Sequence, residues 1–418
     1  MKIQDDVWSQ NNKKVEWRID KYKEKFHYMG KRIAILIADS IYNRKGMMNA
    51  ELNRITHLMR IATYGIDVFT FQTYNGWFVR KLRHQKKSER PKSIIIDGIN
   101  IKIEWNKFSL IDYILTVKLK MRPIISRNWQ YKYSSRFAGY DLIIANSTQM
   151  GDLARYIKQK YNIPYFVTWH GTDIHTAPFE NKYKYEQAKR ILLDAKLNFM
   201  VSESLRNTSK QIAPEASSMV LYNGVSSLFK RYPDSDRLRI RREKGVEGKK
   251  IVAFAGHLIE VKNPQLLPEI FNAVNQKYNA PIEFWVMGTG KKCSYVIDKC
   301  NDYCVPLKMW GNIPANEMPN MLNCVDVQVL PSRNEGLPLI AVEALACGAN
   351  AVGARVGGIP EAMGEENTFV HGPQFIDEIS NRIVFMLQNK VQQPLKPCFS
   401  WERTSEIENG IYLKMLKL

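Results

Sequence analysis

Short, continuous apolar runs alternate with segments of helical spacing along most of this chain. Residues 31–38 (KRIAILIA) have the unbroken hydrophobicity of a fully buried parallel strand. Apolar residues recur at helical spacing over residues 47–62, and residues 66–71 again predict a strand. A strand, a helix and a second strand in this order begin a doubly wound parallel sheet of the α/β class.

The alternation continues through two stretches of the chain. Further strands are predicted at residues 140–145, 164–169, 197–201, 250–255, 282–287, 305–310, 325–330 and 350–352. A linker between the two stretches is expected between Asn223 and about Gly248. The pattern therefore predicts two Rossmann-like domains, each binding ligands at the carboxyl ends of its strands. Two such edges that face each other would leave one deep cleft between the domains.

The composition is that of a globular protein, since 45% of the 418 residues are apolar and 24% are charged. This length suffices for two domains of ordinary size. No apolar run approaches the ~18 residues that span a bilayer, and the first ten residues lack the apolar segment of a signal peptide. We therefore expect a cytoplasmic protein.

Positive charge is concentrated in one half of the chain. Residues 1–230 hold 39 Lys and Arg against 20 Asp and Glu, a net charge of +19, whereas residues 231–418 hold 22 against 21. The densest stretch is residues 80–90, RKLRHQKKSER. Such a surplus indicates a polyanionic partner: anionic lipid, a phosphorylated carrier or substrate, or nucleic acid. The competing interpretation is a solvated basic surface without a partner.

All six cysteines lie in the second half, and the spacing of Cys293, Cys300 and Cys304 places them on one face of a predicted helix. No histidine lies near these three in the sequence, and no C-x-x-C pair occurs. The pattern does not favour a zinc site, and the cysteines are predicted to be reduced core thiols.

The strongest candidate site surrounds Glu335 and Glu343, at a predicted junction between a loop and a helix. Residues 327–332 predict a buried strand, Gly336 frees the backbone, and Pro338 suits the first turn of a helix. The start of a helix offers unpaired N–H groups and a positive dipole end, which suit a diphosphate. Acids beside an anion are useful if they bind neutral hydroxyls, such as those of a ribose and a sugar ring. The alternative is an ordinary strand–loop–helix with two solvated glutamates.

Glycines follow the three preceding strands of the second half. Gly256 ends the first of these strands, and Lys262 stands a short turn later. Gly288 follows the second strand, and Gly311 and Asn312 follow the third. Glycine lets a ligand approach the backbone, a lysine can reach an anion, and the last pair could offer backbone groups to a base edge. Glycines are common after strands, so one such glycine is weak evidence for a ligand site. The stronger indication is that successive strands each end in one, and that the series leads to the two glutamates.

In the first half, His170 follows a predicted buried strand and precedes Gly171 and Asp173. A histidine at a strand end, followed by a glycine and an acid, can reach into a cleft. The alternative is a capped turn whose histidine is satisfied by its neighbours.

Taken together, these residues resemble the retaining GT-B glycosyltransferases of glycosyltransferase family 4, also described as glycosyl transferases group 1. The E-x7-E signature of that family matches Glu335 and Glu343. The glycine-basic-x4-lysine turn of the family matches Gly256-His257 with Lys262. Its strand-end Asn-Gly-Val matches residues 223–225, and its closing Ser-Trp-Glu matches residues 400–402. The resemblance covers about residues 31–418 and is most specific in the second half.

The resemblance implies a GT-B fold, with two facing Rossmann-like, doubly wound domains, an interdomain cleft and a C-terminal helix that crosses back. The corresponding parts are an N-terminal extension (1–29), an acceptor-binding domain (30–224), a domain that binds a nucleotide sugar (225–398) and the crossover helix (399–418).

The resemblance also implies roles for the motif residues. Lys262 and the backbone amides near Gly336 would hold the diphosphate, and Glu343 would bind the ribose hydroxyls. Glu335 would bind hydroxyls of the transferred sugar, which His170 would contact from the acceptor side. The expected catalytic residues are His170, Lys262 and Glu335; the donor-binding residues are Gly256, His257, Lys262, Gly288, Gly311, Asn312, Gly336, Leu337, Pro338 and Glu343; the acceptor-side residues are Gly46 and Asp173.

Such a fold requires neither a metal nor a cofactor, because cationic side chains and a helix dipole can stabilise the leaving diphosphate. No carboxylate of the motifs is placed as a covalent nucleophile, unlike the paired acids of retaining hydrolases. A front-face displacement, in which the departing phosphate takes the acceptor proton, agrees with that pattern and retains the anomeric configuration.

Three positions depart from the family pattern. His257 stands where arginine is usual, so one cation near the diphosphate is neutral or only partly charged. The first loop keeps only Gly46 of a customary diglycine, which puts the placement of the acceptor there in doubt. Ala349-Asn350 replaces the usual turn after Gly348, a local variation of the loop.

A basic acceptor domain suits a lipid-linked or phosphorylated glycan at the inner face of a membrane, where each basic residue near an anionic surface adds about 1 kcal/mol. Residues 108–122 would form an amphipathic helix that lies either in the membrane interface or with its apolar face on the core.

Other functions remain as alternatives. A degenerate subunit that binds sugar nucleotides or glycans, or a nucleotide-sugar epimerase, would have the same fold. A nucleic-acid-binding protein would explain the charge, but no recognition motif accompanies it, and no nucleic-acid partner is expected. The motifs do not distinguish a UDP-linked from a GDP-linked donor.

Overall fold

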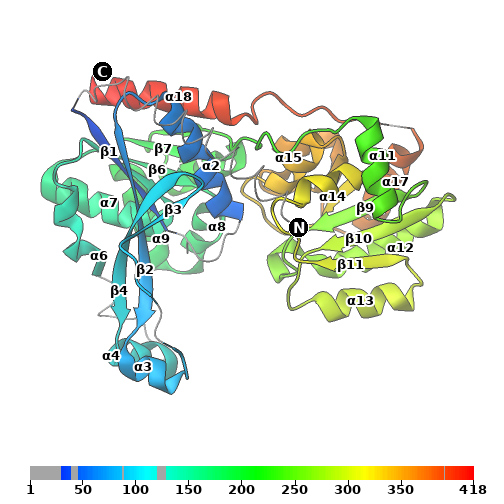
Figure 1. The fold of residues 1–418 in the computed structure, drawn as a ribbon, viewed down its shortest axis with the longest axis horizontal. Helices are drawn as coiled ribbons and strands as arrows, with labels where there is room; N and C mark the ends of the chain where they lie inside the picture. The colour runs from blue at the N-terminus through cyan, green and yellow to red at the C-terminus, as the bar shows by residue number, and fades with distance from the viewer. Residues whose placement is uncertain (1–29, 39–45, 87–88, 120–128, 390) are drawn as a thin grey trace, which may run out of the picture.

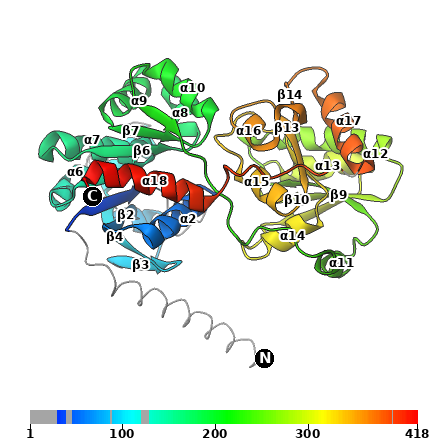
Figure 2. The same cartoon turned by 90° about the horizontal axis from the view of Figure 1, so that it is seen from above.

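The computed structural model describes residues 30–38, 46–86, 89–119, 129–389 and 391–418. Two α/β units, each a twisted sheet flanked by helices, stand side by side, and the last helix, α18 (Trp401–Leu416), lies across the first unit (Figures 1 and 2). This architecture confirms the predicted fold class. The predicted N-terminal extension, residues 1–29, lies outside the described residues.

The first unit is built on an eight-stranded sheet in the order β3-β4-β2-β1-β5-β6-β7-β8. All its neighbouring strands are parallel except β3, which runs antiparallel to β4. Its strands are β1 (Arg32–Ile37), β2 (Gly65–Asn75), β3 (Ser93–Ile96), β4 (Ile99–Phe108), β5 (Leu142–Asn146), β6 (Tyr165–Trp169), β7 (Leu197–Met200) and β8 (Ser218–Val220).

The second unit is built on a fully parallel six-stranded sheet in the order β11-β10-β9-β12-β13-β14. Its strands are β9 (Lys250–Ala255), β10 (Ile282–Met287), β11 (Leu307–Gly311), β12 (Val327–Leu330), β13 (Asn350–Ala354) and β14 (Thr368–Phe369). In both sheets the chain starts in the interior, builds outward to one edge and then returns to build the other. This doubly wound order is what the alternating pattern predicted.

Helices connect the strands and cover the sheets. In the first unit they are α2 (Gly46–Ile61), α3 (Trp77–Leu82), α4 (Leu110–Tyr113), η1 (Ile114–Lys118), α6 (Trp129–Lys132), η2 (Ser134–Phe137), α7 (Ser147–Tyr161), α8 (Thr172–His175), η3 (Ala177–Glu180), α9 (Lys182–Asp194) and α10 (Glu203–Ile212). In the second unit they are α11 (Asp234–Glu243), η4 (Glu260–Lys262), η5 (Pro264–Leu266), α12 (Leu267–Lys277), α13 (Cys293–Asp302), α14 (Met318–Cys324), α15 (Leu339–Ala346), α16 (Ile359–Met363), η6 (Glu365–Asn367) and α17 (Phe375–Gln388).

The central strand of the first sheet shows why a continuous apolar run was a sound signal. Alternate side chains of β1 face opposite sides: Ile33 and Ile35 pack with α2 and α18, whereas Ala34 and Leu36 pack with α7 and α9. Both faces of the strand are therefore buried, so both sets of positions must be apolar.

Two local expectations need correction. The segment predicted as a linker contains a helix, α11, whose Ile240 is buried against the second sheet. Helix α13 ends at Asp302, so Cys304 does not share its face; it follows in a left-handed turn with φ of 53° and is exposed. The six cysteines are free, and burial raises the pKa of Cys300 to about 12.

The two passages of the chain between the units run side by side. Val225 pairs with Ser400 in an isolated parallel bridge, and its backbone N–H donates to the Phe399 carbonyl at 3.1 Å. Gly224 permits this contact, because a Cβ at that position would lie 2.2 Å from the backbone nitrogen of Trp401. The Asn-Gly-Val and Ser-Trp-Glu motifs therefore meet at one crossing point.

We expect Gly224→Ala to lower the free energy of unfolding by about 1–3 kcal/mol, because the added methyl group meets backbone that cannot rotate away. Gly410→Ala is a matched control on the exposed side of α18, where a Cβ meets nothing within 4 Å. This control should be neutral or stabilising by up to about 1 kcal/mol, since alanine favours a helix interior. Urea unfolding of both variants measures the difference, and equal effects would show that the crossing point tolerates a side chain.

Strands β2 and β4 are the longest of the first sheet, with 11 and 10 residues, and they extend beyond it as an arm that carries α3 and α4 at its end (Figure 1). The arm contains the start of the predicted amphipathic segment. Phe108 ends β4, helix α4 and the π-turn η1 follow, and residues 120–128 lie outside the described residues. The core-facing alternative is wrong for this part, because Ile111 is 54% exposed and Leu119 is 57% exposed.

Candidate functional site

The strand order of the second sheet brings two predicted motifs together. The order reverses between the neighbouring strands β9 and β12, so the loops after these two strands lie next to each other at the sheet edge. The first loop carries Lys262, and the second carries Glu335. Neighbouring loops at such a reversal form the usual ligand site of this sheet type.

Lys262 and Glu335 are directly bonded. The Nζ of Lys262 donates to Oε1 of Glu335 at 2.6 Å, and the Oγ of Ser332 donates to the same oxygen at 2.8 Å. The glutamate side chain is only 10% exposed, whereas that of the lysine is 31% exposed. The ammonium group therefore balances the sheltered carboxylate and still reaches solvent, where an anion could approach it.

Further contacts hold these two loops against each other. The backbone N–H of Arg333 donates to the Val261 carbonyl at 2.9 Å, and its guanidinium lies 3.1 Å from Oε1 of Glu260. Its Nε also donates to the side chain of Asn263 at 3.2 Å. Arg333 thus connects the loop after β12, which carries Glu335, to the loop after β9, which carries Lys262.

Glu343 lies on α15, the helix that follows this loop; Leu337 and Pro338 precede the helix, and both are buried. The side chain of Glu343 is half-buried and forms no ion pair or side-chain hydrogen bond with the described residues. Burial raises its pKa to about 7. A sheltered carboxylate without a protein partner is suited to accept hydrogen bonds from ligand hydroxyls.

The raised pKa predicts that Glu343 costs stability at neutral pH. The ordinary pKa of 4.5 describes the unfolded state, so between pH 4.5 and 7 the folded protein holds a proton that the unfolded chain releases. Stability due to this group therefore falls as pH rises through that window, by about 3 kcal/mol in total.

Glu343→Gln should remove this dependence. We expect the variant to unfold at higher urea concentration than the wild type at pH 8, and at nearly the same concentration at pH 4.5. Glu378→Gln, at an exposed position of α17, is the matched control and should show no such pH-dependent gain. Equal pH profiles for Glu343→Gln and the wild type would contradict the assigned burial of this carboxyl group.

The glycines after β9 and β10 pack against each other. A Cβ on Gly288 would lie 2.0 Å from the Gly256 carbonyl oxygen, and one on Gly290 would lie 2.4 Å from that of Leu258. The backbone N–H of Gly256 donates to the Met287 carbonyl at 2.9 Å. The close approach that these glycines permit is therefore between two loops of the protein.

Three other residues were predicted to bind the donor: His257, Gly311 and Asn312. His257 is exposed at the tip of its turn. Gly311 adopts a positive φ of 66°, and a Cβ there would meet nothing within 4 Å. Asn312 is exposed, and its Oδ1 accepts a hydrogen bond from the Thr289 hydroxyl at 3.0 Å.

His170 comes from the first unit, at the end of β6, and it is held in a buried position. Its Nε2 lies 3.5 Å from Oε1 of Glu51 and forms no hydrogen bond with a described residue. Burial, reinforced by the positive charge of Arg54, lowers the pKa of His170 to about 3. The imidazole is therefore neutral at physiological pH, and its Nε2, which is shielded from solvent, lacks a hydrogen-bond partner among the described residues.

The His170 loop touches the loop that carries Glu335, across the domain boundary. A Cβ on Gly336 would lie 1.9 Å from the His170 carbonyl oxygen, and one on Gly357 would lie 2.0 Å from the Glu335 carbonyl oxygen. The segment 335–336 is thus enclosed between the first unit and the loop after β13. The structure brings together His170, Lys262, Glu335 and Gly336, which the sequence had placed in separate motifs.

The two predicted acceptor-side residues have different positions. The Asp173 carboxylate accepts hydrogen bonds from the backbone N–H groups of His170, at 3.1 Å, and Gly171, at 2.8 Å. Its immediate function is to hold the loop that carries His170. Gly46 is the first residue of α2, and residues 43–45 of its loop lie outside the described residues.

The sequence interpretation missed a buried polar network behind His170. Arg54 donates from Nε to Glu408 at 2.6 Å and from Nη1 to the Thr168 hydroxyl at 2.7 Å. Glu408 also accepts a hydrogen bond from the Tyr412 hydroxyl. A signal was present, because Glu51 falls among the apolar positions of α2 that face the core.

None of the helices among the described residues has the length and apolar character needed to cross a bilayer. Within the same residues, no group of three or more His, Cys, Asp or Glu side chains is arranged to hold a metal ion. A site independent of metal stays a prediction.

Known proteins with similar sequences indicate the class of enzyme that this chain resembles. Residues 236–397 match the family model described as glycosyl transferases group 1, which covers the loops of Lys262, Glu335 and Glu343. This stretch of the chain is therefore similar to the glycosyl transferases group 1, and it lies within a GT-B fold. The match confirms the resemblance to glycosyl transferases group 1, whereas family 4 and the retaining mechanism stay predictions.

Individual relatives agree with this class. TuaC of Bacillus subtilis (strain 168), named as a teichuronic acid biosynthesis glycosyltransferase, is 25% identical over 256 residues, which are 61% of this chain and 63% of that protein. YtcC of the same organism, named as a glycosyltransferase, is 30% identical over 217 residues, 47% of this chain and 52% of that protein. The matches thus span less than two thirds of either relative.

A solved structure shares the fold of almost the whole chain. Anabaena Alr3699/HepE, in complex with UDP and glucose, superimposes with a TM-score of 0.65 at 17% identity, covering 93% of this chain and all of that one. At this identity the likeness establishes the fold alone.

Proposed function

We propose that this protein is a retaining glycosyltransferase that moves a sugar from a UDP- or GDP-linked donor to a lipid-linked or surface-polysaccharide acceptor. The observation that carries the proposal is the meeting of the bonded Lys262 and Glu335 with the His170 loop at the domain boundary. The structure of HepE, which has the same fold and was solved in complex with UDP and glucose, supports a nucleotide-sugar donor.

Each group has a task that its surroundings suit. The partly exposed ammonium of Lys262 and the backbone at the start of α15 bind the diphosphate. Glu343, which is sheltered and has no side-chain partner among the described residues, accepts hydrogen bonds from the ribose hydroxyls. Glu335, held by Lys262 and Ser332, accepts from hydroxyls of the transferred sugar. Neutral His170, at the boundary between the two units, contacts that sugar from the acceptor side.

The proposed reaction proceeds on one face of the sugar. The acceptor hydroxyl oxygen attacks the anomeric carbon while the bond from that carbon to the diphosphate oxygen breaks. The departing phosphate oxygen takes the hydroxyl proton, so no protein base is required and the configuration is retained. Lys262 offsets the negative charge that develops on the diphosphate, and the reaction is independent of metal.

The acceptor and its location follow from charge. The first unit holds most of the net charge of +20, and a lipid-linked or anionic glycan at an anionic membrane surface complements it. We therefore place the protein at the cytoplasmic face of a membrane, in the synthesis of a cell-envelope polysaccharide. The name of TuaC, which refers to teichuronic acid biosynthesis, supports this class of pathway.

A transfer assay tests the proposal. Purified protein is incubated with a panel of UDP- and GDP-sugars and a membrane extract, and mass spectrometry follows nucleoside diphosphate release and lipid-linked product. One donor should be consumed by the wild type in the presence of a metal chelator, and much less by Glu335→Gln. Binding of a nucleoside diphosphate without transfer would favour the degenerate subunit, an alternative motivated by His257. Interconversion of free nucleotide sugars would favour the epimerase.

A further inference from the structure

The end of the β2–β4 arm carries features that sugar transfer does not use. We call residues 74–86, 89–90 and 107–119 the arm tip; they include α3, α4 and η1. The arm tip projects from the first unit on the side opposite α18 (Figure 1). None of the residues predicted for donor or acceptor binding lies in it.

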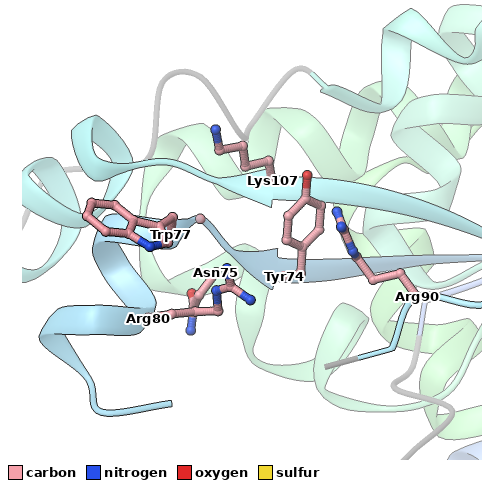
Figure 3. A pocket seen from close by; sticks show the side chains of 7 residues that line it. Tyr74, Asn75, Trp77, Arg80, Arg90 and Lys107 are labelled. Atoms are coloured by element: carbon pink, nitrogen blue, oxygen red, sulfur yellow. The ribbon is translucent and has the colours of Figure 1, made fainter. Parts of the chain in front are cut away.

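A basic pocket opens in the arm tip, with a volume of about 200 Å3. Arg80, Arg90 and Lys107 line it together with Tyr74 and Trp77, and none of the described residues that line it is acidic (Figure 3). The Arg90 guanidinium lies 4.2 Å from the ring centre of Tyr74, which holds it by a cation–π contact. Three cations without an anion in so small a space favour a phosphate group as the ligand.

The charges of the pocket are uncompensated within the part of the chain that the structure describes. No ion pair links Arg80, Arg90 or Lys107 to a described carboxylate, and the Nε of Arg80 is buried without a hydrogen-bond partner. Elsewhere on the same strands the pattern is different, since Lys102 pairs with Asp67 at 2.7 Å. An external anion would supply what the pocket lacks.

Large apolar side chains are exposed around this pocket. Trp77 and Phe78 are each 58% exposed and stack edge to face, with ring centres 4.5 Å apart. Leu82 is 57% exposed on the same helix, while Ile111 and Leu119 are 54% and 57% exposed on the neighbouring segment. Exposed aromatic and aliphatic residues beside basic ones are typical of surfaces that enter the headgroup region of a bilayer.

The positive charge of the arm tip, together with its exposed apolar side chains, favours a membrane over a second copy of the chain or a soluble phosphate. The exposed rim of the arm tip adds further basic side chains, among them Lys81, Arg83, Lys86 and Lys118. Pairing with a second copy would bring these like charges together, which is unfavourable. A soluble phosphate would fill the pocket and leave the apolar side chains in water. An anionic bilayer satisfies both features.

We propose that the arm tip binds an anionic lipid bilayer, with the phosphate of a lipid headgroup in the pocket and the apolar side chains of α3 and α4 in the interface. This inference deepens the proposed function, because it rests on the membrane location given there and assigns the surface responsible. The arm then anchors the first unit at the membrane through its far end, away from the bonded Lys262 and Glu335.

Sedimentation with vesicles tests the inference on the full chain. The wild type should bind vesicles of phosphatidylglycerol and phosphatidylcholine, and pure phosphatidylcholine at least tenfold more weakly. Arg80→Ala/Arg90→Ala/Lys107→Ala and Trp77→Ser/Phe78→Ser should each lose at least tenfold in affinity for the anionic vesicles. Lys182→Ala/Lys196→Ala/Lys210→Ala removes the same charge from exposed positions outside the arm tip and should lose threefold or less.

Three results would overturn the inference. Equal losses for the pocket variant and the control variant would show that only net charge matters. Vesicle binding unchanged in Trp77→Ser/Phe78→Ser, with an altered oligomeric state, would make the arm tip a contact between copies. Complete displacement from vesicles by millimolar glycerol 3-phosphate would make it a site for soluble phosphates. Nucleoside diphosphate binding, measured on the same variants, should be unchanged; its absence from the wild type would count against the proposed function alone.

Discussion

Lys262→Met is expected to lower kcat/KM for sugar transfer about 10²- to 10³-fold, the effect of removing one electrostatic stabiliser from an active site. The substitution keeps an unbranched apolar stem and removes the ammonium group. It also leaves the Glu335 carboxylate, which is 10% exposed, with the Ser332 hydroxyl as its remaining side-chain donor. Both effects weaken the hold on a donor diphosphate.

Lys291→Met is the control for this prediction, since it removes an exposed lysine of the same unit. It should change kcat/KM by less than twofold. The folded fraction of both variants is checked by urea unfolding before the assay. A Lys262→Met enzyme with wild-type kcat/KM would contradict the role of the lysine, and the assigned site would then lack its cation.

Glu408→Ala is expected to lower the free energy of unfolding by about 3–5 kcal/mol, the usual cost of removing one partner from a buried ion pair. The two charged side chains, Arg54 and Glu408, are 7% and 2% exposed, so the guanidinium would lose its counter-ion without gaining water. The pair attaches α18 to α2 and, through Thr168, to β6, the strand that precedes His170.

Urea unfolding measures this loss, and Glu406→Ala, at an exposed position of the same helix, should change stability by less than about 0.5 kcal/mol. The double substitution Arg54→Met/Glu408→Leu replaces both charges by apolar groups and should recover much of the loss. If Glu408→Ala were as stable as the wild type, the ion pair would not be what holds the C-terminal helix on the first unit.

Local patterns predicted most of the fold because each strand is short, buried and apolar in its own sequence. The strands at residues 250–255 and 282–287 have the predicted bounds. The neighbouring positions of the β9 and β12 loops also followed from strand order, which is a general property of doubly wound sheets. Lys262 and Glu335 were therefore predictable as members of one site.

The contacts that complete the site depend on chain segments far apart in the sequence. Nothing near residue 54 indicates Glu408 as its partner, since the bond joins positions 354 residues apart. Nor does a glycine show what approaches it: Gly288 lies against the Gly256 carbonyl, and Gly336 against that of His170. In each case the neighbour is protein backbone that only the folded chain brings near.

The most direct test of the account is isothermal titration of UDP and GDP into the wild type, Glu343→Gln and Lys262→Met. One of the two nucleotides should bind the wild type, and both variants should bind it at least tenfold more weakly, as expected for the loss of a hydrogen-bonded or charged contact of about 1.5–3 kcal/mol. If neither nucleotide binds the wild type, or if all three proteins bind equally, the nucleotide-sugar site is not where Lys262, Glu335 and Glu343 place it.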